Sequence, residues 1–137
     1  MFDTVLIAGL GLMGGSMAKT IKARTLSRVL GWNRTRATAE QALADGSIDA
    51  IATEALYKEA DLVIIGLYPQ ATVDWLLENM PKMKKGCVIV DMVGVKQFMV
   101  DHLEQAALDA GVHYVGGHPM AGREFSGLDY SLPTLFD

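Results

Sequence analysis

The fold of this chain is decided by the stretch Val5-Leu6-Ile7-Ala8-Gly9-Leu10-Gly11-Leu12-Met13-Gly14-Gly15-Ser16. An apolar run rich in β-branched residues ends in the pattern Gly-x-Gly-x-x-Gly, and residues 17–22 then open a helix. Glycines placed between a strand and a helix predict a dinucleotide-binding turn. Gly9 allows the tight turn, Gly11 lets the backbone approach a pyrophosphate, and Gly14 lets the helix pack closely on the strand. The alternative is a glycine-rich strand-to-helix turn that binds nothing.

The helix that follows this turn presents free backbone N–H groups and a partial positive charge at its first residues. Both features favour the phosphates of a dinucleotide. We therefore expect the whole turn to contact the cofactor. The predicted contacts are Gly9, Leu10, Gly11, Leu12, Met13 and Gly14.

Composition sets limits on the class of protein. The 137 residues suffice for one domain, and the net charge of −4 argues against nucleic acid or an anionic membrane as the main partner. No apolar run approaches the roughly 18 residues of a membrane span. The single cysteine, Cys87, lies in an apolar strand-like run, which predicts a buried packing residue and a cytoplasmic protein. No His, Cys and carboxylate spacing suggests a metal site.

Apolar runs and helical periodicities alternate along the whole chain. Strands are predicted over residues 4–8, 28–32, 50–52, 62–67, 87–90 and 112–115, and helices over residues 13–23, 36–44, 55–59, 70–80 and 95–110. Alternating strands and helices predict an α/β fold of the Rossmann type, with a doubly wound parallel sheet, and residues 1–137 as one dinucleotide-binding domain. Loop signals from Gly116 to Asp137 indicate that the chain is cut before a following domain.

The residues after the second strand predict which cofactor is preferred. An acidic residue there reads the adenosine ribose of NAD, whereas this chain has Asn33-Arg34-Thr35-Arg36. A neutral amide, two guanidinium groups and a hydroxyl suit the 2′-phosphate of NADP, so NADP is expected and NAD is the alternative. Replacing Asn33 by Asp and Arg34 by Ala should then shift the preference towards NAD. Thr35 alternatively caps the helix while both arginines are solvated.

A second cofactor-facing segment is expected at the end of the fourth strand. Ligands of such folds bind outside the carboxyl ends of the strands, where this chain has Leu67, Tyr68 and Pro69. Pro69 ends the strand and Tyr68 can pack on the cofactor. A plain surface aromatic residue is the alternative for Tyr68.

The candidate chemical group is His118, which follows the last strand in Gly116-Gly117-His118-Pro119-Met120-Ala121-Gly122-Arg123-Glu124-Phe125-Ser126-Gly127. Oxidation of an alcohol by hydride transfer needs a group that takes the hydroxyl proton, and histidine titrates near neutral pH. His102, within a helix, and His113, before a strand, are interpreted as structural.

Three motifs together resemble the prephenate/arogenate dehydrogenase family of tyrosine biosynthesis. These motifs are the glycine turn, the segment Asp91–Lys96 and the Gly-Gly-His-Pro-Met-Ala-Gly-Arg-Glu block. The resemblance implies NAD(P)-dependent oxidative decarboxylation of prephenate to 4-hydroxyphenylpyruvate, with His118 accepting a hydrogen bond from the ring hydroxyl and Glu124 at the entrance of the active site. Gly94 stands where many members have a substrate-proximal serine, so any such contact must come from another group.

The resemblance also implies a homodimer formed through a helical C-terminal domain that completes the site, so these residues alone are expected to be inactive. Whether the substrate is prephenate or arogenate stays open. The nearest rival is a β-hydroxyacid dehydrogenase or imine reductase, in which Asn-Arg-Thr also follows the second strand. A non-catalytic NADP-sensing module is the rival from another class, but it has no need of His118.

Overall fold

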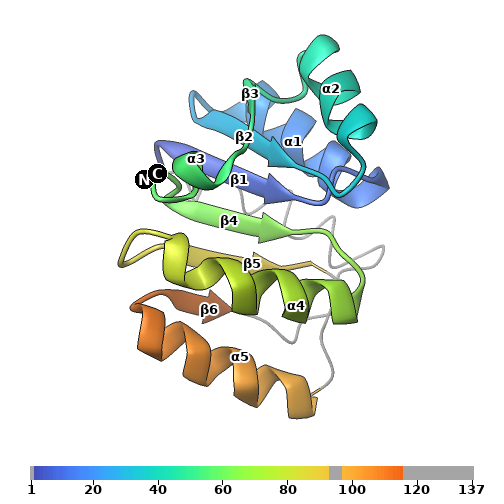
Figure 1. Ribbon diagram of the computed structural model, residues 1–137. Coiled ribbons are helices and arrows are strands. Elements are labelled where there is room, and N and C mark those ends of the chain that lie inside the picture. The colour runs from blue at the N-terminus through green and yellow to red at the C-terminus, as the bar shows by residue number, and fades with distance from the viewer. Residues whose placement is uncertain (1, 93–96, 116–137) are drawn as a thin grey trace.

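The computed structural model describes residues 2–92 and 97–115 of the chain. Their strands form one parallel sheet in the order β3-β2-β1-β4-β5-β6 (Figure 1). The strands are β1 (Thr4–Ala8), β2 (Arg28–Trp32), β3 (Ala50–Ile51), β4 (Leu62–Ile65), β5 (Val88–Asp91) and β6 (His113–Val115). The helices are α1 (Leu12–Arg24), α2 (Arg36–Ala44), α3 (Glu54–Tyr57), α4 (Pro69–Asn79) and α5 (Gln97–Ala110), with a 3-10 turn at Met80–Lys82. The predicted doubly wound parallel fold is confirmed.

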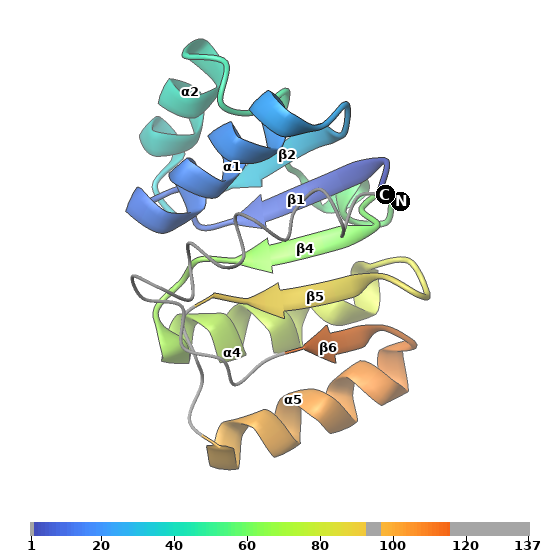
Figure 2. The ribbon, with the colours of Figure 1, turned by 180° about the vertical axis from the view of Figure 1, so that it is seen from behind.

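Helices cover both faces of this sheet. The helices α1 and α2 lie on one face, and α3, α4 and α5 lie on the other (Figure 2). Successive side chains of a strand point to opposite faces, so Val5 and Ile7 pack with the α1 side while Leu6 and Ala8 pack with the α4 side. All four are fully buried, which explains why the run is apolar without alternation.

The predicted element bounds differ from the structure by one or two residues at most ends within the described part of the chain. The difference that matters for the site is at β4, which ends at Ile65 although the apolar run continues to Leu67. Its neighbour β1 pairs with it only as far as Ala8, opposite Ile65, and turns away at Gly9. Since the chain leaves the sheet at Gly66, residues 66–68 become a loop at the carboxyl edge.

The buried state predicted for Cys87 is confirmed. The thiol is fully buried, and burial raises its pKa to about 12. A thiol with that pKa is almost entirely protonated at neutral pH, so it is not a nucleophile there.

Asp61 links the start of β1 to the start of β4 at the amino edge of the sheet. Its Oδ2 accepts hydrogen bonds from the backbone N–H groups of Asp3 and Thr4, both at 2.9 Å, and its Oδ1 forms an ion pair with Lys84. Partial burial pushes the pKa of the Asp61 carboxyl upward, but the bonds from Lys84, Thr4 and Asp3 outweigh it and the pKa lies below its usual value. The ionised form is therefore the one that holds the start of β1 against the start of β4.

We expect Asp61→Asn to lower the free energy of unfolding by about 1–3 kcal/mol at neutral pH, because charge-assisted bonds are lost. A carboxyl with a lowered folded-state pKa stabilises the protein above its unfolded pKa of about 3.9, and loses this contribution as the pH falls through the folded value. Urea titrations at pH 7 and in acid should show the gap between wild type and variant closing in acid. The exposed Asp74→Asn is the control, and a gap independent of pH contradicts the assignment.

Candidate functional site

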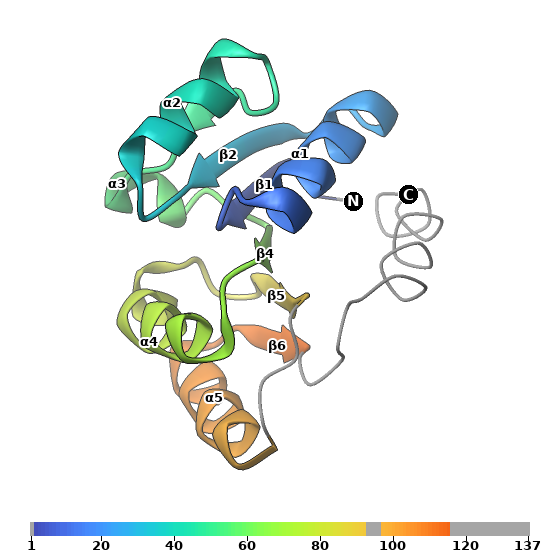
Figure 3. The ribbon, with the colours of Figure 1, turned by 90° about the vertical axis from the view of Figure 1, so that its right-hand side faces the viewer.

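A groove with a volume of about 560 Å³ opens at the carboxyl edge of the sheet. It lies where the strand order reverses, because the chain runs outward from β1 to β3 and then returns to β4 on the other side of β1 (Figure 3). Ligands of doubly wound sheets bind at such switch points. The groove is lined by Gly9, Gly11, Leu12, Met13, Asn33, Arg34, Gly66, Leu67, Tyr68 and Ala71.

The floor of the groove is a close contact between three backbone segments. Gly9 has a φ of +97°, and a Cβ on it would lie 2.8 Å from the carbonyl oxygen of Gly66. A Cβ on Gly14 would lie 1.7 Å from the carbonyl oxygen of Gly9. Hence β1, α1 and the loop after β4 approach this closely only with glycine at these positions. At Gly11, by contrast, a Cβ would meet nothing within 4 Å, so the backbone there is open to a ligand.

The helices α1, α2 and α4 begin at this edge, and their first turns carry no carboxylate. The helices α1, α2 and α4 follow Gly11, Thr35 and Tyr68, and none of the three has a side-chain cap or an acidic residue in its first turn. The first N–H groups of a helix have no partner within the helix and carry a partial positive charge. Within residues 2–92 and 97–115, Arg34 is the one charged residue that lines the groove. The groove therefore suits a ligand with phosphate groups.

Arg34 differs from the neighbouring arginines in having its charge available. Arg28 is paired with Glu59 at 3.0 Å, and Arg36 with Glu40 at 3.3 Å. Arg34 is exposed and makes no hydrogen bond or ion pair with any residue in the described ranges. Sequence reasoning offered both Arg34 and Arg36 as phosphate ligands, and the structure favours Arg34.

Asn33 is held in place by two bonds within the protein. Its Oδ1 accepts a hydrogen bond from the N–H of Leu10 at 2.8 Å, and its Nδ2 donates to the carbonyl of Thr35 at 3.0 Å. Thr35 is the residue before α2, but its hydroxyl makes no capping hydrogen bond. The alternative interpretation of Thr35 as a side-chain cap is therefore wrong.

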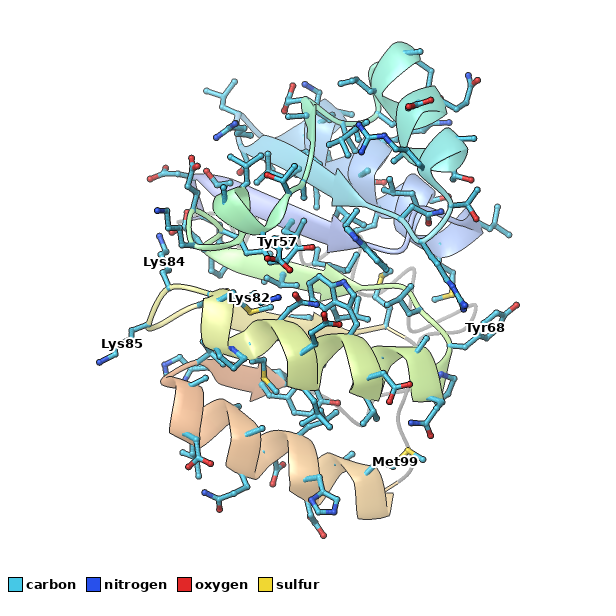
Figure 4. The ribbon with its side chains drawn as sticks, in the orientation of Figure 1. Tyr57, Tyr68, Lys82, Lys84, Lys85 and Met99 are labelled. Atoms are coloured by element: carbon cyan, nitrogen blue, oxygen red, sulfur yellow. The ribbon has the colours of Figure 1, made fainter. Side chains whose placement is uncertain are left out.

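Tyr68 stands at the mouth of the groove. Its side chain is 85% exposed, and Figure 4 shows it projecting from the end of the sheet opposite to Lys84 and Lys85. Leu12, on the other wall, is 89% exposed. These two apolar side chains flank a groove whose floor is backbone, an arrangement that suits a flat ring between them.

Four of the residues predicted for the cofactor do not line the groove. The side chain of Leu10 is buried beneath α1 and α2, and Gly14 serves the packing of α1 on β1. Thr35 precedes α2, and Pro69 is the first residue of α4, where its missing N–H costs nothing. Sequence reasoning missed Gly66 and Ala71, which line it. Gly66 could have been found as the glycine that interrupts the apolar run after β4.

The predicted substrate-side residues Gly94, His118 and Glu124 lie outside the described residues. The strands β5 and β6 precede the segments that contain these three residues. A side-chain hydrogen bond joins the two strands. Asp91, with 1% exposure at the end of β5, accepts a hydrogen bond from the hydroxyl of Tyr114 in β6 at 3.2 Å. Burial and the carboxylate charge raise the pKa of the Tyr114 hydroxyl, so it stays a donor at neutral pH.

The histidines that sequence reasoning interpreted as structural do not line the groove. His102 and His113 are exposed on α5 and β6. Across residues 2–92 and 97–115 no three side chains of the metal-binding types gather at one place. In the same part of the chain, every helix is too short or too polar to cross a bilayer.

Comparison with known proteins assigns this chain to a family. Residues 17–137 match the family model described as "Prephenate dehydrogenase, nucleotide-binding domain". The chain is 38% identical to prephenate dehydrogenase of Bacillus subtilis and 30% identical to that of Lactococcus lactis, over 100% and 97% of its own length. It spans 38% of the length of each of these relatives.

A solved structure agrees. The prephenate dehydrogenase of A. aeolicus, in complex with hydroxyphenyl propionate and NAD+, superimposes with a TM-score of 0.77 and 26% identity over 90% of this chain and 44% of its own. The family match covers most of the chain and includes Asn33, Arg34 and the loop after β4, which line one side of the groove, whereas the glycine turn at residues 9–14 precedes it. The chain therefore belongs to the prephenate dehydrogenase family and matches the nucleotide-binding domain of that family.

Proposed function

We propose that the protein containing this chain catalyses the NADP-dependent oxidative decarboxylation of prephenate to 4-hydroxyphenylpyruvate. The observation that carries the proposal is the family match over residues 17–137, which includes the His118 block. The positively polarised groove at the switch point supports it independently. Because the chain spans 38% of its curated relatives, the remainder of the protein is proposed to complete the substrate site and to form a homodimer. We place the reaction in the cytoplasm.

Each wall of the groove is assigned to one part of a dinucleotide. The N–H groups at the start of α1 and the open backbone at Gly11 receive the pyrophosphate. The guanidinium of Arg34 receives the 2′-phosphate of the adenosine ribose. Tyr68 packs against the adenine end, as its exposed ring beside the groove allows. The residues present therefore fit a nicotinamide dinucleotide.

The substrate-side residues are assigned from the sequence. His118 accepts a hydrogen bond from the ring hydroxyl and polarises it, and Glu124 stands at the entrance of the site. Gly94 has no hydroxyl, so the contact to substrate that a serine would make comes from the backbone or from another side chain. A bound nicotinamide supplies the acceptor for the hydride that leaves C4 of the ring. Loss of the ring carboxylate as CO2 then completes an aromatic ring, which makes the reaction favourable.

The direct experiment is an assay of the full-length protein for NADPH formation with prephenate and, separately, with arogenate. Turnover of prephenate with release of 4-hydroxyphenylpyruvate is the expected result. Turnover of arogenate alone would retain the reaction class and correct the substrate. Nucleotide binding with neither substrate turned over would favour the NADP-sensing module.

Arg34→Ala should weaken NADP binding by roughly ten- to a hundredfold, since a charge-assisted contact contributes about 1.5–3 kcal/mol. NAD lacks the 2′-phosphate, so its affinity should change little. Calorimetric titration of both nucleotides measures the ratio, with Arg36→Ala as the control because Arg36 is already paired with Glu40. Equal affinities of the wild-type protein for NAD and NADP would refute the assigned preference.

A further inference from the structure

Asn33 continues the pairing of β1 with β2 beyond the point where the strands end. The two strands pair as far as Ala8 opposite Trp32, and the N–H of Gly9 then donates to the carbonyl of Trp32 at 2.8 Å. After Gly9 the backbone turns away from β2. The next donor, the N–H of Leu10, is met by the side-chain oxygen of Asn33 at 2.8 Å. The amide thus takes the place of one more backbone carbonyl.

The same amide also fixes the turn that leads into α2. Its Nδ2 donates to the carbonyl of Thr35 at 3.0 Å, so one side chain bridges the glycine turn and the segment that presents Arg34. An amide accepts and donates at the same time, whereas a carboxylate only accepts. Asn33 therefore suits this bridge in a way that an aspartate of the same shape does not.

The ends of β1 and β2 that flank the bond between Leu10 and Asn33 are anchored in the core. The side chain of Leu10 is 6% exposed and packs with Ile48 and Ala42 beneath the helices α1 and α2. On the other side, the ring of Trp32 packs against Trp75 with ring centroids 5.7 Å apart. The bridge therefore joins two well-packed strand ends, and the groove-lining residues from Gly11 onward continue from its Leu10 end.

We propose that Asn33 is a positioning residue that holds the glycine turn in the shape that receives the phosphates, rather than a reader of the adenosine ribose. Of Asn33 and Arg34, it is then Arg34 that discriminates between NADP and NAD. The inference rests on the proposed dinucleotide site. It replaces the sequence-based hypothesis in which the neutral charge of Asn33 admits the 2′-phosphate.

A positioning role and a ribose-reading role for Asn33 predict different effects of a substitution on the affinities for NADPH and NADH. Removing a group that reads the ribose changes the ratio of NADPH to NADH affinity. Removing a group that shapes the phosphate site shared by both nucleotides weakens the binding of each by the same factor. Loss of one or two hydrogen bonds corresponds to a factor of roughly ten.

The test measures dissociation constants for NADPH and NADH by calorimetry on the full-length protein. Asn33→Ala should weaken both by roughly tenfold with their ratio unchanged, whereas Arg34→Ala should change the ratio. Gln105→Ala is the matched control: it removes an amide from an exposed i,i+4 contact with Asp109 on α5, and both affinities should stay as in the wild type. A changed ratio in Asn33→Ala, or no loss of either affinity, overturns the proposal.

Asn33→Asp provides a second variant that keeps the acceptor for Leu10 and removes the donor to Thr35. A reader of the ribose would gain NADH affinity with this carboxylate, and the positioning role predicts no gain. A rise in NADH affinity above the wild type therefore overturns the proposal.

Amide hydrogen exchange of the nucleotide-free protein tests the bridge independently of nucleotide binding. The Leu10 amide should be protected in the wild type and in Asn33→Asp, and should exchange faster in Asn33→Ala. Unchanged exchange in Asn33→Ala refutes the bridge. A wild type that binds neither nucleotide refutes the proposed dinucleotide site instead, whatever the exchange rates show.

Discussion

Gly14→Ala should destabilise the protein by about 3 kcal/mol or more, although alanine is the better helix former. The new Cβ would lie 1.7 Å from the carbonyl oxygen of Gly9, where ordinary contact begins at 3.4 Å. The helix α1 must therefore move away from β1 by more than an ångström. Because α1 supplies the N–H groups assigned to the pyrophosphate, kcat/KM for NADP in the full-length protein should fall on the order of a hundredfold. Urea unfolding and steady-state kinetics measure the two effects.

Gly15→Ala is the matched control, because Gly15 is the next residue of the same helix. Its Cβ would have the carbonyl oxygen of Leu10 as its nearest neighbour, at 3.5 Å, which is an ordinary contact. The substitution should leave catalysis unchanged and stabilise the protein by up to about 1 kcal/mol through helix propensity. Equal effects of the two alanines would show that the close approach at Gly14 does not matter.

His118→Asn in the full-length protein should lower kcat by roughly 10²- to 10⁴-fold, the usual contribution of a positioned acid–base group. NADP affinity should stay nearly the same, because the residues assigned to the phosphates come from β1, β2 and their turns. Asparagine retains polarity and similar size but has no imidazole nitrogen to accept the hydroxyl bond. Rapid-quench or steady-state measurement of kcat beside calorimetric NADP binding separates the two quantities.

The pH profile gives a second readout for His118. An imidazolium cannot accept a hydrogen bond, so the wild-type rate should fall on acidification through a pKa in the histidine range, about 6.5. This acidic limb should be absent from the asparagine variant. A variant with a nearly normal kcat, or one that keeps the limb, assigns the role to another group and returns His118 to a structural role.

The sequence alone determined the features that depend on near neighbours in the chain. The strand, turn and helix at residues 4–24 follow from apolar β-branched residues, three spaced glycines and helix formers. Repetition of strand and helix predicted the parallel sheet, and the continuous apolar runs predicted that it is covered on both faces. The burial of Cys87 followed in the same way. These predictions are confirmed because each rests on the order of residues along the chain and on no particular contact between distant side chains.

Tertiary structure decided which groups at the carboxyl edge are free and which are engaged. Arg28 and Arg34 both flank β2, but the fold brings Arg28 against Glu59, 31 residues further along the chain, and brings no carboxylate of the described residues against Arg34. Asn33 is bonded to a backbone group 23 residues earlier, and Gly66 lies against Gly9 only because β4 returns beside β1. Contacts between distant segments depend on the strand order and on the closeness of backbones, and neither leaves a local pattern in the chain.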